Sequence, residues 1–213
     1  MARKLYGYWR SSAAYRVRIA LALKGLEYER ELIDLRTGAQ HSATFKSINP
    51  QGFVPYLIDG DVGVGQSLAI IEYLDERYPE PRLIPQHFHE RARARAMALV
   101  IACDIHPLNN LRVLKHLESS LHLDRQGVNA WARKWIEQGF ASLEAMSTGP
   151  HRYLACDSVT IADVCLVPQM YNARRVETDL GKFPRLFEIE QRLMALPAFQ
   201  QEEPEAQSEA SPL

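Results

Sequence analysis

The sequence predicts two parts of different fold class: a mixed α/β part over the first 80 residues and an all-helical part after it. Before residue 80, short runs rich in aromatic and apolar residues alternate with amphipathic helical segments. Residues 78–85 then contain three prolines, which is typical of a stiff connector. After the connector the apolar residues recur with helical spacing only. We therefore predict domains at 1–80 and 89–200, with a linker at 81–88.

The first part has the pattern strand, helix, strand, then hairpin and helix. We expect strands at 4–9 and 28–35 around a helix at 13–24, which Gly25 ends. A helical crossover implies that these two strands pair in parallel. Asp59-Gly60-Asp61 is a tight turn between strands at 56–58 and 62–64, so this pair is antiparallel. Ser67 then begins a helix, which we expect it to cap.

The second part predicts four helical segments. These are a long stretch at 89–121 bent at Pro107, a helix at 131–146, one that opens at Thr160, and a last one at 184–196. Thr160 and Asp163 have the spacing of a capping box, in which each side chain binds the backbone of the other. Residues 201–213 are rich in glutamate and nearly free of apolar residues, and we expect an acidic, disordered tail there.

Charge and composition exclude several classes of function. The formal net charge of -1 gives no support for nucleic-acid binding. No apolar run approaches the length of a membrane span, and the N-terminus lacks the apolar core of a secretory signal. Three widely spaced cysteines among apolar residues indicate reduced core thiols in a cytoplasmic protein. We expect no metal site.

Several motifs carry a resemblance to a known family. RSSAAYRVRIALALKG, NPQGFVPYL and GQSLAIIEYLDERYP resemble the glutathione-contacting segments of zeta-class glutathione transferases. CDIHPLNNLRVLK and VTIADVCLVPQMYNARR resemble the helical domain of the maleylacetoacetate and maleylpyruvate isomerases of that class. The match spans residues 4–200. It implies a thioredoxin-like N-terminal domain of order βαβββα, an all-α C-terminal domain, and a homodimer.

The resemblance also implies a reaction. In this family the thiolate of glutathione adds to a cis double bond flanked by carbonyls, the resulting single bond rotates, and elimination gives the trans isomer. Maleylacetoacetate or maleylpyruvate, intermediates of aromatic-compound and tyrosine breakdown, is then the expected substrate, and the sequence does not separate them. Two alternatives remain open: a general transferase that conjugates or dehalogenates small α-halo acids, and a non-catalytic binding protein of the same fold.

The doubled serine after the first strand is the expected catalytic position. Ser11 matches the family's catalytic serine and is the expected hydrogen-bond donor to the thiolate, while Ser12 is a second donor or the helix cap. In the alternative reading both serines only cap the helix. Ala13 replaces a cysteine of the family pattern. Because the reacting thiol belongs to glutathione, we expect this replacement to spare isomerisation.

Other segments are expected to bind glutathione. The resemblance implies that the Val54-Pro55 bond is cis and that the Val54 main chain pairs with the tripeptide. Gln66 and Ser67 lie at a helix start, where backbone N–H groups can hold a carboxylate.

Four further residues are expected to contact either glutathione or the substrate. His106 and Asn110, four residues apart, are expected to contact glutathione, with a polar helix surface as the alternative. Arg10 and Arg175 match the family's candidates for the carboxylates of the substrate, because a guanidinium group binds a carboxylate through two parallel hydrogen bonds.

Overall fold

The computed structural model describes residues 3–208, which divide into two compact units. Unit 1 consists of residues 3–83 together with 195–208, and unit 2 of residues 84–194. The division thus falls after Leu83, inside the predicted linker, and the last described segment returns to unit 1.

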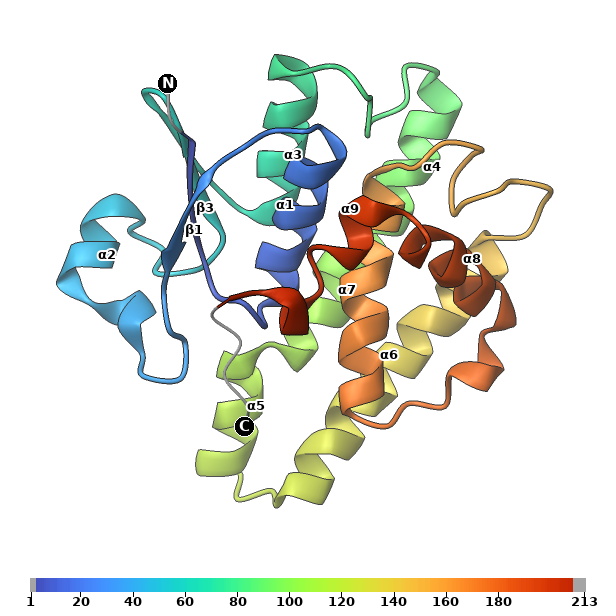
Figure 1. Cartoon of the computed structure of the whole chain (residues 1–213). Coiled ribbons are helices and arrows are strands. Elements are labelled where there is room, and N and C mark those ends of the chain that lie inside the picture. The colour runs from blue at the N-terminus through green and yellow to red at the C-terminus, as the bar shows by residue number, and fades with distance from the viewer. Residues whose placement is uncertain (1–2, 209–213) are drawn as a thin grey trace. The chain divides into compact units, whose positions relative to one another are not determined.

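Unit 1 is built on a four-stranded sheet of order β2-β1-β3-β4 (Figure 1). β1 pairs in parallel with β2 and antiparallel with β3, which in turn pairs antiparallel with β4. The strands are β1 (Arg3–Gly7), β2 (Glu29–Leu32), β3 (Tyr56–Asp59) and β4 (Val62–Gly65). The predicted parallel crossover and antiparallel hairpin are both confirmed.

The helices of unit 1 lie on both sides of this sheet. α1 and α3 lie on one side and α2 on the other (Figure 1). The helices are α1 (Ser12–Leu23), η1 (Ala39–His41), α2 (Ala43–Ile48), α3 (Ser67–Arg77), α9 (Pro197–Gln200) and η5 (Pro204–Ala206). α1 and α3 bury their apolar side chains with those of the sheet, including Leu5, Ile19, Leu57, Ile70 and Leu74. The predicted βαβββα order is confirmed, with η1 and α2 as unpredicted insertions between β2 and β3.

Unit 2 is all-helical, as expected. Its elements are α4 (Phe88–Leu99), the π-helix η2 (Val100–Ile105), the 3-10 helix η3 (His106–Asn109), α5 (Leu111–Ser119), α6 (Arg125–Met146), α7 (Ile161–Arg175), η4 (Leu180–Lys182) and α8 (Pro184–Met194). α7 is the central helix: eleven of its residues are buried. It begins at the predicted capping box, in which the Thr160 backbone N–H donates to the Asp163 carboxylate over 2.8 Å.

The stretch expected to form one bent helix at 89–121 is instead four consecutive elements. α4 passes into one π-helical segment, then a 3-10 turn, and α5 begins afresh with Asn110 as its N-cap. Pro107 lies in the first turn of η3, where its missing N–H breaks no helical hydrogen bond. The change of helix type therefore begins before the proline.

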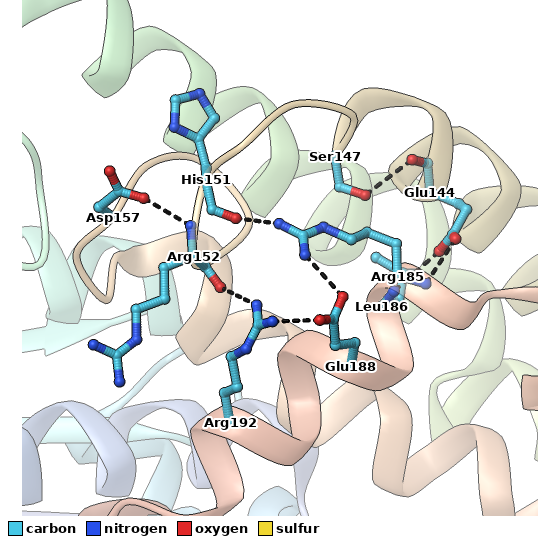
Figure 2. Close-up of polar contacts among 9 residues, drawn as sticks. All are labelled: Glu144, Ser147, His151, Arg152, Asp157, Arg185, Leu186, Glu188 and Arg192. Atoms are coloured by element: carbon cyan, nitrogen blue, oxygen red, sulfur yellow. Dashed lines mark hydrogen bonds and ion pairs between the residues drawn. The ribbon is translucent and has the colours of Figure 1, made fainter.

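The loop between α6 and α7 is fastened to α8 by two arginines of α8 that donate to loop carbonyls (Figure 2). Arg185 and Arg192 both bind Glu188, and they also donate to the backbone carbonyls of His151 and Arg152. Glu144 of α6 accepts from the backbone N–H groups of Arg185 and Leu186, over 2.8 and 3.0 Å. This carboxylate caps the first turn of α8, where the helix dipole favours a negative charge. The C-terminal part of α6 and the loop residues His151 and Arg152 thus all contact α8.

The expectation of a disordered tail is wrong for residues 201–208. Glu202, Pro204 and Gln207 are buried, and η5 forms within the segment. The segment is ordered because it packs against the body of unit 1, where Phe199 is buried and Glu202 meets Arg18 and Arg30. The remainder of the predicted tail, residues 209–213, lies outside the described residues.

Candidate functional site

The candidate site of unit 1 begins in the turn between β1 and α1. Ser11 is the N-cap of α1, with extended backbone, and its Oγ accepts from the Ala14 backbone N–H over 3.3 Å. Ser12 is the first helical residue, so of the two roles expected for it the cap belongs to Ser11, and its role as a second donor stays a prediction. The cap uses Ser11 Oγ as an acceptor, which leaves its hydroxyl proton to be donated to another group.

Arg10 lies directly before this cap and is partly exposed. Its guanidinium carbon lies 5.4 Å from the centroid of the Trp9 ring, within the range of a cation–π contact. Trp9 is itself buried. Arg10 therefore lies over a buried ring, with its guanidinium group near the N-terminus of α1.

A second segment of unit 1 presents free backbone groups. The Val54-Pro55 peptide bond is cis, as expected. Asn49 holds the preceding turn, because its amide nitrogen donates to Phe53 O over 2.7 Å and its amide oxygen accepts from Gln51 N over 3.2 Å. Val54 lies just before β3 and makes no backbone hydrogen bond in the described part of the chain. Its main chain is available to an extended peptide.

The start of α3 forms an anion-binding geometry. Gln66 is the N-cap, with φ of 67° and no side-chain cap, so first-turn N–H groups of α3 are open. A positive φ at glutamine is a strained conformation of the kind found at ligand sites. The Gln66 amide is oriented by Gln51 Oε1 at 2.8 Å.

Ser67 is the first helical residue of α3 and not its cap, which corrects the expectation. Its Oγ accepts from the Arg16 guanidinium over 3.2 Å, so its proton also remains for a ligand. Arg16 is only 2% exposed and brings a positive charge beside the helix N-terminus. Both features favour a carboxylate at this position.

Together these groups fit a small acidic peptide. The open first turn of α3 and the Ser67 hydroxyl suit a carboxylate, the Val54 main chain suits a backbone, and the Ser11 hydroxyl suits an anionic sulfur. Unit 1 thus contains Ser11, Val54, Pro55, Gln66 and Ser67, and their groups suit the carboxylate, the backbone and the sulfur of such a peptide.

In unit 2, His106 and Asn110 approach each other. The Asn110 amide nitrogen lies 3.4 Å from His106 Nε2. They do so across a 3-10 turn and not along one α-helix face. Asn110 Oδ1 also accepts from Arg112 N over 3.2 Å and caps α5, so part of this side chain is structural.

The two arginines at the end of α7 have different surroundings. Arg174 binds the buried carboxylate of Glu190, with its NH1 at 2.6 Å from Oε1. Arg175 is exposed, and its NH1 lies 3.5 Å from Asn172 Oδ1. The Asn172 amide in turn donates to Asn109 Oδ1 over 3.2 Å. Arg174 is thus paired with a buried carboxylate, whereas Arg175 contacts a neutral amide.

Sequence reasoning missed Arg16, Asn49 and Gln51, which support the site without being part of the expected set. The signal for Arg16 is its place in the run Ala13–Leu23, where a charge in an otherwise apolar helix marks a buried partner. Among the described residues no group of three or more His, Cys, Asp or Glu side chains is arranged to hold a metal ion. Within residues 3–208, no helix has both the length and the apolar character to cross a membrane.

Comparison with known proteins places this geometry in a family. Residues 1–76 match the glutathione S-transferase N-terminal domain. The chain is 51% identical over 209 residues to a probable maleylacetoacetate isomerase of Vibrio cholerae, with 97% of each chain covered.

Solved structures of similar proteins match the fold over 98% of this chain. A holo maleylpyruvate isomerase, described as a bacterial zeta-class glutathione S-transferase, has a TM-score of 0.95 at 41% identity, covering 98% of this chain and 100% of that one. A maleylacetoacetate isomerase of Methylobacterium extorquens with bound malonate and glutathione has a TM-score of 0.94 at 40% identity, with the same coverage. The chain therefore belongs to the zeta-class glutathione transferases, in the family of the maleylacetoacetate and maleylpyruvate isomerases.

Proposed function

We propose that this chain is a glutathione-dependent cis–trans isomerase of a diketo acid such as maleylacetoacetate or maleylpyruvate, and that it works as a cytoplasmic homodimer in aromatic-compound breakdown. The observation that carries the proposal is the Ser11 geometry: its oxygen accepts from the Ala14 N–H, which leaves its proton for a bound sulfur at the N-terminus of α1. The relatives support the substrate class, since one binds both glutathione and malonate, a dicarboxylate.

The chemical problem at this site is the thiol. With a pKa of about 8.5, as for cysteine, only about 3% would be thiolate at pH 7. Lowering that pKa by two units requires about 2.7 kcal/mol of preferential stabilisation of the anion. A charge-assisted hydrogen bond supplies about 1.5 to 3 kcal/mol and a helix N-terminus about 0.3 to 1. Ser11, as donor at the N-terminus of α1, combines both.

When bound, glutathione supplies a thiolate that adds reversibly to the substrate double bond. The first turn of α3 and Ser67 hold the γ-glutamyl carboxylate, and the Val54 main chain aligns the tripeptide. Ser11 keeps the sulfur anionic, with Ser12 as a second donor.

His106 and Asn110 contribute polar contacts to glutathione, and Arg10 and Arg175 bind carboxylates of the substrate. Ala13 takes no part, so the chemistry needs no protein thiol at that position.

The test is isomerisation by the purified full chain with and without glutathione, with free thiol measured throughout. We expect turnover of maleylacetoacetate or maleylpyruvate only when glutathione is present, with the thiol concentration unchanged. Isomerisation without glutathione would overturn the cofactor assignment. Thiol consumption with a small α-halo acid, and no isomerisation of either diketo acid, would instead establish the transferase alternative. Binding of glutathione without turnover of any of these compounds would establish a binding protein.

A further inference from the structure

The segment 195–208 crosses back onto unit 1 and packs beside α1 (Figure 1). Phe199 in α9 is fully buried, and its carbonyl accepts from the Tyr15 hydroxyl over 3.3 Å. Gln207 closes the segment on itself, with its amide nitrogen 3.1 Å from Gln201 O and 2.8 Å from Glu203 O. We call residues 195–208 the strap. It is a defined structure and not a loose tail.

A buried charge cluster joins the strap to the body of unit 1. The Glu202 carboxylate lies 3.4 Å from Arg18 Nε and 3.3 Å from an Arg30 nitrogen. Arg18 is 4% exposed and Glu202 7%. Burial lowers the pKa of Arg18 and raises that of Glu202, while the opposite charges counteract both shifts. Because such buried pairs stabilise a fold little or not at all relative to apolar packing, stability alone does not explain this one.

Arg18 continues the connection toward the candidate site. Helical side chains slant toward the N-terminus of their helix, so Arg18 reaches back along α1. Its NH2 donates to Trp9 O over 3.1 Å and to Glu202 O over 3.0 Å. Trp9, Arg18 and Gln207 also line one small cavity.

Trp9 immediately precedes the two candidate residues. Its ring lies under Arg10, and the turn that starts at Tyr8 is closed by the Ser11 N–H, which donates to Tyr8 O over 3.0 Å. The orientation of the Trp9 peptide therefore sets where this turn places the Ser11 hydroxyl.

We propose that Glu202 is a positioning residue, which holds Arg18 on the Trp9 carbonyl and thereby fixes Ser11 and Arg10. The inference rests on the proposed function for the roles of Ser11 and Arg10. Without the carboxylate, the guanidinium groups of Arg18 and Arg30 would face each other with their mutual repulsion uncompensated. Arg18 would then move, and a displacement of about 1 Å at a reacting group can lower a rate about a hundredfold.

The test is Glu202→Gln, which retains the size and the backbone carbonyl of Glu202 but removes its charge. In the protein without glutathione, we expect amide hydrogen exchange at Ala14, whose N–H binds Ser11 Oγ, to become at least about tenfold faster. With glutathione bound, we expect the thiol pKa, followed by thiolate absorbance, to rise by about one unit. At neutral pH kcat should fall about tenfold, while the KM for glutathione stays within about twofold.

Two further substitutions separate positioning from general destabilisation. Glu202→Asp retains the charge and should recover most of the lost kcat and the original thiol pKa. Glu205→Gln, at an exposed glutamate of the same strap, should leave all three measurements unchanged. If Glu202→Gln does not fold, Gln207→Ala loosens the strap without leaving a buried charge, and should shift the same measurements in the same direction by a smaller factor.

Two outcomes would each overturn a different proposal. A lower melting temperature for Glu202→Gln, with unchanged exchange at Ala14 and unchanged thiol pKa, would overturn the proposal and leave Glu202 as a stabilising residue only. Absence of isomerase activity in the unmodified chain would overturn the proposed function instead. The exchange at Ala14 and the pKa of the bound thiol would still decide whether Glu202 positions Ser11.

Discussion

Ser11 uses one oxygen for two purposes, since it caps α1 as an acceptor and retains a proton to donate. Replacing it with alanine removes both. We expect Ser11→Ala to lower isomerase turnover at least about tenfold, equivalent to about 1.4 kcal/mol, measured as kcat at saturating glutathione. The lost cap should also reduce the free energy of unfolding by about 1 kcal/mol.

Ser42→Ala is the matched control for this experiment. Ser42 caps α2 through the same kind of bond, in which its Oγ accepts from Phe45 N over 3.2 Å. We expect the same loss of stability with turnover unchanged. Equal turnover in Ser11→Ala and the unmodified chain would remove Ser11 from the mechanism.

The conformation of Gln66 gives a second residue-scale prediction. Its φ of 67° is unfavourable for any residue with a Cβ and easy for glycine. Gln66→Gly and Gln66→Ala both lose the amide, but only glycine relieves the strain. We expect the glycine variant to be about 1 kcal/mol more stable than the alanine variant in urea unfolding. Equal stabilities would show that the backbone at this position is not strained.

At this scale the sequence identifies the chemical groups better than their geometry. The motif match singled out Ser11, Gln66 and Ser67, yet Ser67 was expected to cap α3 and is its first helical residue, while the cap of α1, left open between the two serines, belongs to Ser11. A cap is decided by whether the backbone at that residue is still extended, and neighbouring serines have the same preference for it. Arg16 and Arg18 were not singled out because α1 is buried on nearly all sides, so helical periodicity gives no face for them.

At the scale of elements, the π-helix η2 packs closely against α6. A Cβ built on Gly139 of α6 would overlap the side chain of Ile105, so this close approach favours glycine there. The sequence could not predict this contact, because it joins residues far apart in the chain. Pro107, the visible signal, lies after the change from α to π geometry and only accompanies it.

Gly139→Ala tests this packing. We expect a loss of up to about 2 kcal/mol in the free energy of urea unfolding, since overpacking costs about 1 to 3 kcal/mol and the higher helix propensity of alanine offsets about 1. In the double variant with Ile105→Ala, which removes the clashing carbons, the added cost of Gly139→Ala should disappear. Strict additivity of the two substitutions would contradict the contact.

For the molecule as a whole, the buried carboxyl of Asp163 links stability to pH. Burial raises the pKa of Asp163 from its ordinary 3.8 to about 6, although hydrogen bonds from Leu154 and Thr160 oppose the shift. The folded state therefore binds this proton more tightly than the unfolded chain. The stability from this group is fully present below pH of about 4 and is lost as pH rises through about 6, in total by roughly 3 kcal/mol.

Asp163→Asn isolates this contribution. We expect the free energy of unfolding of the unmodified chain, relative to the variant, to fall by roughly 3 kcal/mol between pH 4 and pH 7 in urea titrations. A difference for Asp163→Asn that does not vary with pH would contradict the raised pKa of Asp163.

The two-part organisation was predictable because it follows from local signals: prolines, turn residues and the period of apolar positions. The strap was not, because composition alone makes an acidic segment read as disordered. Its order depends on Arg18 and Arg30, which lie more than 170 residues earlier in the chain. Local composition contains no information about partners at that distance.

The return of the strap to unit 1 also sets an order of events during protein synthesis. Residues 195–208 leave the ribosome only after the whole of unit 2 has been made, so unit 1 cannot be completed when its first 83 residues emerge. During that interval Arg18 has no carboxylate from Glu202, and the surface that later contacts Phe199 is exposed to solvent. The N-terminal part of the nascent chain thus remains incomplete, with apolar surface accessible to chaperones, until residues 195–208 have been synthesised.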